Sequence, residues 1–313
     1  MSNSSFGIVF PGQGSQSVGM LSELAAAHPI VSQTFAEATD VLGYDLWELV
    51  QNGPNDSLNQ TTKTQPAMLA AGVSVWRVWL EQGGAKPIIM AGHSLGEYTA
   101  LVCADAIEFT DAVRLVAERG RFMQEAVPEG SGGMAAILGL DDDQVKTVCA
   151  EAASGDVIEA VNFNSPGQVV VAGHKEAVDR ACVLAKEAGA KRALPLPVSV
   201  PSHCALMKPA AERLAQLLNE VSISQPSISV IHNASVAAAK DAESIRKQLA
   251  AQLYSPVRWV ETVQMMATSG ISSLLETGPG KVLAGLTKRI DRSLVGLPVF
   301  DAKSLMQALE TLK

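Results

Sequence analysis

Short runs of apolar residues alternate along the chain with longer stretches in which apolar residues recur at helical spacing. The runs at Gly7–Phe10, Lys86–Ala91 and Ser272–Glu276 have the length and composition of buried strands. A helical stretch follows each run, over residues 18–27, over residues 96–106 and from about residue 281 onward. Because strands that alternate with helices form parallel sheets covered on both faces, the pattern predicts an α/β fold with a mostly parallel sheet.

The order of the elements changes in the middle of the chain. From Gly133 to Val200 the pattern predicts a ferredoxin-like unit with the order β-α-β-β-α-β. Its strands are expected over residues 134–140, 157–163, 167–173 and 192–200, and its helices over residues 141–153 and 175–189. We therefore expect a small domain of residues 131–200 inserted into a large α/β domain of residues 1–130 and 201–313, with ligands bound in the cleft between them.

The composition indicates a globular protein with a large core. The chain has 313 residues, 47% of them hydrophobic, which is enough for more than one structural unit. It has no basic leader and no apolar run long enough to span a bilayer, so we expect a cytoplasmic protein without a membrane partner. The four cysteines are scattered without metal-binding or disulfide spacing, which fits a reducing compartment: Cys103, Cys149, Cys182 and Cys204.

The charge balance narrows the class of partner. The formal net charge is −8, which argues against nucleic acid, because phosphate binding requires a basic surface. An acidic protein partner would need a local basic patch. Four basic residues near the C-terminus could form one: Lys281, Lys288, Arg289 and Arg292. Basic residues also favour the C-terminus of a helix, which explains the same cluster equally well.

A glycine-rich loop follows the first expected strand, in the segment VFPGQGSQSVGM. Gly14 and Gly19 have the spacing of a Walker phosphate-binding loop, but Met20 stands where that loop needs lysine. The segment also fails as a dinucleotide fingerprint, because Ser17 takes the place of the third glycine. A plain strand-to-helix turn remains as the simplest interpretation.

The pentapeptide Gly92-His93-Ser94-Leu95-Gly96 matches the G-x-S-x-G nucleophile motif. An apolar run precedes the motif and an amphipathic stretch follows it, which is the strand-to-helix context that a nucleophile elbow requires. The turn would project the Ser94 hydroxyl out of the sheet and direct the backbone N–H of Leu95 toward an oxyanion. The alternative is a structural serine in a glycine-rich turn.

A nucleophilic serine needs a base, and the chain offers five histidines. His203 lies where the chain crosses back into the large domain, between an expected strand and an expected helix whose N-terminus would keep the imidazole neutral. His232, at the end of a strand, is the second candidate. A capping or core role is the alternative for His203, and Cys204 beside it is expected to be a small buried residue. The other three are expected at a helix end, beside the serine and in a turn: His28, His93 and His174.

Several short motifs occur in one order along nearly the whole chain. They are PGQGSQ from Pro11, TQPA from Thr64, GHSLGE from Gly92, RG at Arg119, NSPGQ from Asn164, PSH from Pro201, QLYSPVRW from Gln252 and GPG from Gly278. Each motif alone is weak, but the ordered set resembles the malonyl-coenzyme A:acyl carrier protein transacylases of type II fatty acid biosynthesis. The resemblance implies a hydrolase-like α/β core with a ferredoxin-like insertion, in agreement with the pattern above.

The resemblance also implies roles for the candidate residues. Ser94 would carry the malonyl group as an ester, and His203 would be the general base, held by the main-chain carbonyl of Gln252. The backbone N–H groups of Leu95 and Gln13 would bind the oxyanion. Coenzyme A would leave, and the phosphopantetheine thiol of an acyl carrier protein would then take the malonyl group in the second half of a ping-pong reaction. No metal or redox cofactor would be needed.

The resemblance also implies which residue determines substrate selectivity. The helical stretch 111–125 contains three arginines that residue type alone cannot distinguish, Arg114, Arg119 and Arg121. The family match selects Arg119, whose guanidinium would bind the free malonyl carboxylate through two parallel hydrogen bonds and so reject acetyl groups. Ser202, before the histidine, fits a malonyl rather than a methylmalonyl pattern. Gln65 and Asn162, together with the NSPGQ turn, are expected to line the cleft.

We therefore expect a monomeric malonyltransferase that uses malonyl-coenzyme A and docks acyl carrier protein near Lys281, Lys288 and Arg289. Three alternatives stay open at this stage. One is a serine thioesterase that delivers the acyl group to water, and another is an acyltransferase with broader acyl specificity. The third is a non-catalytic protein that binds acyl-coenzyme A.

Overall fold

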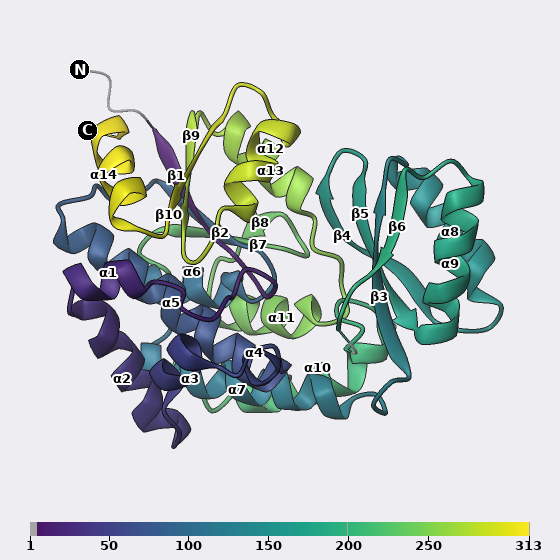
Figure 1. Ribbon diagram of the computed structural model, residues 1–313, viewed down its shortest axis with the longest axis horizontal. Coiled ribbons are helices and arrows are strands. Elements are labelled where there is room, and N and C mark those ends of the chain that lie inside the picture. The colour runs from purple at the N-terminus through teal and green to yellow at the C-terminus, as the bar shows by residue number, and fades with distance from the viewer. Residues whose placement is uncertain (1–4, 199, 313) are drawn as a thin grey trace.

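A six-stranded sheet forms the centre of the larger part of the molecule, in a computed structural model that describes residues 5–198 and 200–312 (Figure 1). The strand order is β10-β9-β1-β2-β7-β8, and all neighbouring strands are parallel except the β7–β8 pair. The strands are β1 (Phe6–Phe10), β2 (Ile89–Gly92), β7 (Ser229–His232), β8 (Ala237–Ala238), β9 (Ser273–Thr277) and β10 (Val295–Val299). The prediction of a mostly parallel sheet is confirmed.

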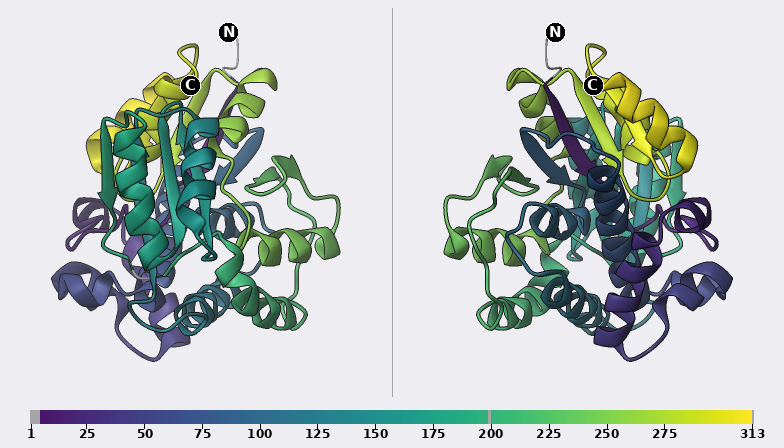
Figure 2. Two further views of the ribbon diagram at one scale, coloured as in Figure 1. Left: turned by 90° about the vertical axis from the view of Figure 1, so that its right-hand side faces the viewer. Right: turned by 90° about the vertical axis from the view of Figure 1, so that its left-hand side faces the viewer.

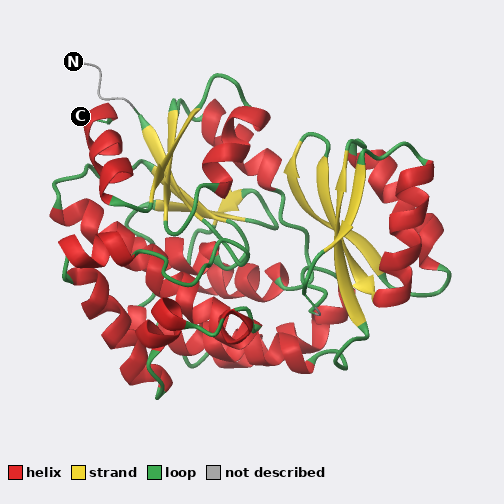
Figure 3. Ribbon diagram, in the orientation of Figure 1, coloured by secondary structure: helices red, strands yellow, loops and turns green. Residues whose placement is uncertain are grey.

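Helices cover both faces of this sheet (Figure 3), and alternate residues of β1, β2, β7 and β9 enter different hydrophobic clusters. On β1, Ile8 and Phe10 pack into the larger cluster and Val9 packs into the opposite one. Around the sheet lie α1 (Ser22–Ala27), α2 (Ile30–Leu42), α3 (Leu46–Asn52), α4 (Asn55–Leu58), α5 (Thr61–Glu81), α6 (Gly96–Cys103), α7 (Phe109–Glu125), a 3₁₀ turn (Ala205–Met207), α10 (Lys208–Leu218), α11 (Ala242–Gln252), α12 (Trp259–Thr268), α13 (Val282–Ile290) and α14 (Ala302–Thr311).

An antiparallel four-stranded sheet forms the second part of the molecule, to the right in Figure 1. Its strands are β3 (Gly132–Leu138), β4 (Ile158–Ser165), β5 (Gln168–His174) and β6 (Arg192–Pro195), in the order β4-β5-β3-β6. The helices α8 (Asp142–Ala153) and α9 (Lys175–Glu187) cover one face, as the side views in Figure 2 show. The chain order β-α-β-β-α-β confirms the predicted ferredoxin-like unit.

Two boundaries differ by four residues or more from those expected. The last strand of the small sheet ends at Pro195 instead of continuing to Val200, because Pro195 and Pro197 have no N–H for a strand ladder. Residue 199 of that expected strand lies outside the described residues. The first helix begins at Ser22 instead of Val18, because the chain turns through a left-handed Gly19 (φ 82°) and Leu21 (φ 62°) before it can become helical. Among the described residues, no helix is long and apolar enough to cross a membrane.

Candidate active site

Ser94 lies in a tight turn between the end of β2 and the start of α6. Its φ of 50° is a left-handed conformation, which is uncommon for a residue with a side chain. Two glycines make the turn possible: a Cβ on Gly92 would lie 1.8 Å from the carbonyl carbon of Gly96, and a Cβ on Gly96 would lie 2.1 Å from the carbonyl oxygen of Phe10. The strand, turn and helix that G-x-S-x-G requires are therefore present.

The hydroxyl of Ser94 contacts the imidazole of His203. The Oγ of Ser94 lies 2.8 Å from Nε2, and Nδ1 lies 2.8 Å from the main-chain oxygen of Gln252. Because a carbonyl only accepts, Nδ1 carries the proton, and Nε2 is left to accept the serine hydroxyl. The geometry is that of a serine nucleophile with an oriented base.

Burial keeps the His203 imidazole neutral. The side chain is 2% exposed, and this burial, followed by the positive charge of Arg119, lowers the pKa of His203 to about 3. The expectation that a helix N-terminus would lower this pKa is wrong in its cause. The chain becomes helical only at Ala205, with a 3₁₀ turn, and His203 itself has a φ of 70°.

Arg119 is the buried arginine among the three on α7. Its side chain is 1% exposed and donates from Nη1 to Gln65 Oε1 (2.8 Å) and from Nη2 to Gln252 Oε1 (2.9 Å). Nη2 also lies 3.4 Å from the Oγ of Ser94, so the guanidinium faces this hydroxyl. Among the described residues, Nε of Arg119 has no hydrogen-bond partner.

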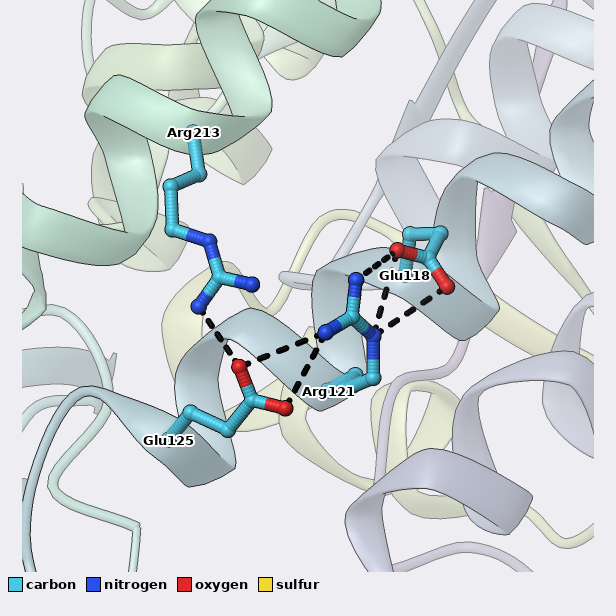
Figure 4. A network of polar contacts seen from close by, with 4 residues as sticks. All are labelled: Glu118, Arg121, Glu125 and Arg213. Atoms are coloured by element: carbon cyan, nitrogen blue, oxygen red, sulfur yellow. Dashed lines mark hydrogen bonds and ion pairs between the residues drawn. The ribbon is translucent and has the colours of Figure 1, made fainter.

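The other two arginines of α7 point to solvent. Arg114 is 66% exposed and lies 3.7 Å from Asp111. Arg121 pairs with Glu118 and Glu125 of its own helix, and Glu125 also pairs with Arg213 of α10 (Figure 4). Neither Arg114 nor Arg121 contacts Ser94, so the structure separates the three arginines where residue type could not.

The glycine-rich loop after β1 contacts the turn that carries Ser94. A Cβ on Gly12 would lie 2.5 Å from the carbonyl oxygen of His93, so only glycine allows the two backbones to approach so closely. Gln13 follows on the exposed side of this contact, with its side chain 3.5 Å from Thr61 Oγ1. Leu95 directly precedes α6. The next three N–H groups donate to the carbonyls of His93, Ser94 and Leu95, whereas the N–H of Leu95 has no such bond among the described residues.

The small sheet reaches the site through β4. The Oδ1 of Asn164 accepts from His93 Nε2 (2.8 Å), and the main chain of Phe163 donates to Val257 O (3.0 Å). Asn162, which was expected to line the cleft, lies on the same strand with its Oδ1 buried. Among the described residues, this oxygen has no partner, so it does not hydrogen-bond to Ser94, His203 or Arg119.

Two residues that the sequence analysis did not assign to the site, Glu97 and Asn233, are linked to the turn of Ser94 by hydrogen bonds. The buried carboxylate of Glu97 accepts from His232 Nδ1 (2.7 Å), Asn233 N (2.9 Å) and Gln252 Nε2 (2.9 Å). His232, the second candidate base, therefore bonds to Glu97 and not to Ser94. Two signals in the sequence point to Glu97: it ends the motif GHSLGE, and it is the acidic residue in the helix GEYTALVC.

The remaining histidines lie elsewhere. His28 lies 3.8 Å from Glu81, and Nδ1 of His174 accepts from the backbone N–H of Val157 (3.0 Å). The basic cluster lies on and beside α13, and its four members are exposed: Lys281, Lys288, Arg289 and Arg292. Arg289 also donates to Gln168 of the small sheet (3.1 Å).

The chain is similar to known acyltransferases over nearly its whole length. The acyl transferase domain family matches residues 8–298. A malonyl CoA-acyl carrier protein transacylase of Salmonella typhimurium is 60% identical over 304 residues, which cover 97% of this chain and 98% of that protein.

Two solved structures have the same fold. An acyl carrier protein S-malonyltransferase of Vibrio cholerae is 60% identical with a TM-score of 0.95, and the match covers 97% of this chain and 100% of that one. A malonyl-transacylase in complex with a type II PKS acyl-carrier protein is 59% identical with a TM-score of 0.97, and the match covers 98% of this chain and 100% of that one.

Proposed function

Because the chain belongs to the acyl transferase family, among the malonyl CoA-acyl carrier protein transacylases, we propose that it transfers malonyl groups through an ester on Ser94. Malonyl-coenzyme A is the donor and the thiol of an acyl carrier protein is the acceptor. One observation carries the assignment of the site: the Oγ of Ser94 lies 2.8 Å from His203 Nε2 and 3.4 Å from Arg119 Nη2. The base, His203, and the carboxylate-binding cation, Arg119, thus both lie next to the nucleophilic oxygen of Ser94.

In the first half-reaction, Ser94 Oγ attacks the thioester carbonyl while His203 Nε2 takes the hydroxyl proton. The carbonyl of Gln252, 2.8 Å from Nδ1, holds the ring and stabilises the imidazolium that forms. The tetrahedral intermediate then collapses, the carbon–sulfur bond breaks, and His203 returns the proton to the sulfur of coenzyme A. The malonyl group remains as an ester on Ser94.

The backbone N–H groups of Leu95 and Gln13 stabilise the oxyanion of the intermediate. The start of α6 supports the role of Leu95, because its N–H has no hydrogen-bond partner among the described residues and can donate to the substrate. The close approach of Gly12 to the His93 carbonyl supports the role of Gln13, because it brings the loop of Gln13 against the turn of Ser94.

Arg119 binds the free carboxylate of the malonyl group. Gln65 and Gln252 each accept one N–H of its guanidinium, which holds the planar group in place and leaves further donors for the substrate. An acetyl group offers no carboxylate, so the buried cation stays unpaired and acetyl transfer is disfavoured. This arrangement supports selectivity for dicarboxylic acyl groups, with Asn162 lining the cleft from β4.

In the second half-reaction, the phosphopantetheine thiol of an acyl carrier protein attacks the ester, and His203 now takes the thiol proton and returns it to Ser94. The acidic carrier docks near Lys281, Lys288 and Arg289, with Arg292 beside them. This basic cluster is exposed in a chain of net charge −8, so it offers a local positive surface.

Charge reversal tests the docking surface. The double variant Lys288→Glu and Arg289→Glu should raise the apparent KM for carrier protein while the rate of serine acylation by malonyl-coenzyme A stays unchanged. Since Arg289 also donates to Gln168, the Gln168→Ala variant is the matched control and should keep the normal KM. An unchanged KM in the double variant would exclude this docking surface.

We also propose the division into a small domain of residues 131–200 and a large domain formed by the rest. It is supported by a hydrophobic cluster confined to residues 135–193, between the small sheet and its two helices. We propose further that the enzyme acts as a monomer and needs no metal or redox cofactor, because the steps above use only the groups of Ser94, His203, Gln252 and Arg119. Light scattering tests whether the enzyme is a monomer. Activity after treatment with a chelator tests whether it needs a metal ion.

Intact-mass measurement tests the proposed function. Incubation with malonyl-coenzyme A should add one malonyl group to the wild-type chain, and Ser94→Ala should gain none. Added carrier protein should remove the group and become malonylated itself. An absent adduct would contradict the transferase mechanism, and rapid discharge to water without carrier protein would instead indicate a hydrolase.

A further inference from the structure

Glu97 lies beneath the proposed nucleophile and binds the residues that hold both Ser94 and Arg119. We propose that Glu97 is a positioning residue for malonyl transfer: its carboxylate fixes the side-chain amide of Gln252, which in turn holds Arg119 ready for the malonyl carboxylate. The inference rests on the proposed role of Arg119 as the carboxylate-binding residue. It adds a buried acidic residue that touches no substrate.

The orientation of the Gln252 amide follows from its two charged neighbours. Its Nε2 donates to Glu97 Oε2 (2.9 Å) and to the main-chain oxygen of Ser94 (3.0 Å), and its Oε1 accepts from Arg119 Nη2 (2.9 Å). A carboxylate only accepts and a guanidinium only donates. Rotating the amide by 180° would set oxygen against carboxylate and N–H against guanidinium. Glu97 therefore determines which atom of Gln252 faces Arg119.

The interposed amide also leaves Arg119 available. Glu97 is 0% exposed and Arg119 is 1% exposed, and two opposite charges in one buried site attract strongly. A direct ion pair would occupy the guanidinium and compete with the malonyl carboxylate. Through Gln252 the two charges are linked by hydrogen bonds while a further N–H of Nη2 still faces Ser94 Oγ at 3.4 Å.

The same carboxylate also supports the turn of Ser94, through Asn233. Glu97 accepts from the backbone of Asn233 (2.9 Å), and the Asn233 side chain accepts from Ser94 N (2.7 Å) and donates to Gly92 O (2.7 Å). His232 completes the set by donating from Nδ1 to Glu97 Oε1 (2.7 Å). One carboxylate thus connects the nucleophile turn with the carboxylate-binding arginine.

The readout that distinguishes positioning from simple stability is acyl selectivity. In the Glu97→Gln variant, the ratio of kcat/KM for serine acylation by malonyl-coenzyme A to that by acetyl-coenzyme A should fall about 10- to 100-fold. Glutamine keeps one acceptor oxygen but carries no charge, so the hydrogen bond from Gln252 loses its charged partner, and a change of this size is expected when a hydrogen bond to a charged group is weakened. A loss of folded enzyme alone would lower both rates equally and leave the ratio unchanged.

Glu276 provides a matched control. It is also 0% exposed, and its carboxylate accepts from the backbone N–H groups of Leu283 (3.0 Å) and Ala284 (2.7 Å) at the start of α13. Glu276→Gln removes a buried carboxylate of the same kind without touching Gln252, so the malonyl-to-acetyl ratio should stay at the wild-type value.

A second variant keeps the inference testable if Glu97→Gln does not fold. Gln252→Leu removes the amide but retains the main-chain carbonyl that orients His203, and it should lower the ratio to a similar degree. A wild-type ratio in folded Glu97→Gln, or in Gln252→Leu, would overturn the inference. Failure of the wild-type chain to form a malonyl adduct would instead overturn the proposed function, so the two failures are distinguishable.

Discussion

The imidazole of His203 is held neutral by its surroundings, and this sets the pH dependence of the reaction. Burial and the Arg119 charge lower its pKa from 6.5 to about 3, so protonation occurs only in acid well below the usual histidine range. Because only the neutral ring accepts the Ser94 proton, the rate of serine acylation should be nearly constant between pH 5 and pH 7. Rapid-quench measurement across this range tests the expectation.

A tenfold fall in the acylation rate per pH unit below a midpoint near 6.5 would contradict this account of His203.

The lowered pKa of His203 also affects the stability of the fold. Because the pKa is lower in the folded chain, the unfolded chain binds the proton first, and stability is lost as the pH falls from about 6.5 toward 3. The free energy of unfolding should therefore fall with pH before His203 becomes protonated in the folded state.

The guanidinium of Arg119 should determine the choice between acyl groups. Arg119→Ala should lower kcat/KM for malonyl-coenzyme A by about 10²-fold or more, because the substrate carboxylate loses a buried charge partner. The value for acetyl-coenzyme A should change much less. Acylation rates for both substrates check this, with Arg114→Ala on the exposed face of the same helix as the control. An equal fall for the two substrates would contradict the assignment.

Local motifs account for only part of the candidate site. Ser94 could be identified from five adjacent residues, since the strand, glycines and helix that its turn requires are all consecutive. Arg119 and Gln252 came from the family resemblance, and Glu97 was missed. Its partners His232 and Asn233 lie 135 and 136 positions away along the chain, and no periodic pattern encodes such contacts. The available clues were its place at the end of GHSLGE and its acidic side chain inside a largely apolar helix.

At the scale of elements, close contact between β1 and α6 positions the nucleophile. Gly96→Ala should destabilise the fold by about 2 kcal/mol or more, because the added Cβ would lie 2.1 Å from the Phe10 carbonyl oxygen. Activity should fall with it, since the same turn carries Ser94. Denaturant unfolding with a parallel acylation assay gives both values.

Gly285 on α13 serves as the comparison for Gly96, because a side chain there has free space. A Cβ there meets no described atom within 4 Å, so Gly285→Ala should stabilise the helix by about 0.5–1 kcal/mol with unchanged acylation. If both glycine variants had the same stability, steric contact at Gly96 would not be what requires glycine there.

Surface ion pairs contribute less to this arrangement than the buried contacts do. Arg213 on α10 pairs with Glu125 of α7 at 2.6 Å (Figure 4). Its guanidinium carbon lies 4.1 Å from the ring centre of Phe122. The pair connects the helix that carries Arg119 with the helix that follows His203. Both charged side chains are more than 40% exposed, so water and salt screen the pair and it adds little to stability.

At the scale of the whole molecule, alternation of apolar runs and helices was sufficient to predict the fold class. The period of two along β1, with Ile8 and Val9 on opposite faces, requires covering on both sides, and the β-α-β-β-α-β order defines the second sheet. The ends of elements were harder to predict, because Pro195 and Pro197 interrupt an otherwise apolar stretch. How the two parts meet could not be predicted, because it depends on contacts distant in sequence, such as His93 with Asn164 and Arg289 with Gln168.

The central claim is that malonyl transfer passes through an ester on Ser94, and the chemical competence of that ester tests it most directly. Malonylated enzyme, freed of coenzyme A by gel filtration, would be mixed rapidly with carrier protein and quenched at intervals. The account predicts stoichiometric transfer to the carrier thiol at a rate no slower than kcat. Discharge slower than turnover, or release of malonate in place of malonyl carrier protein, would contradict it.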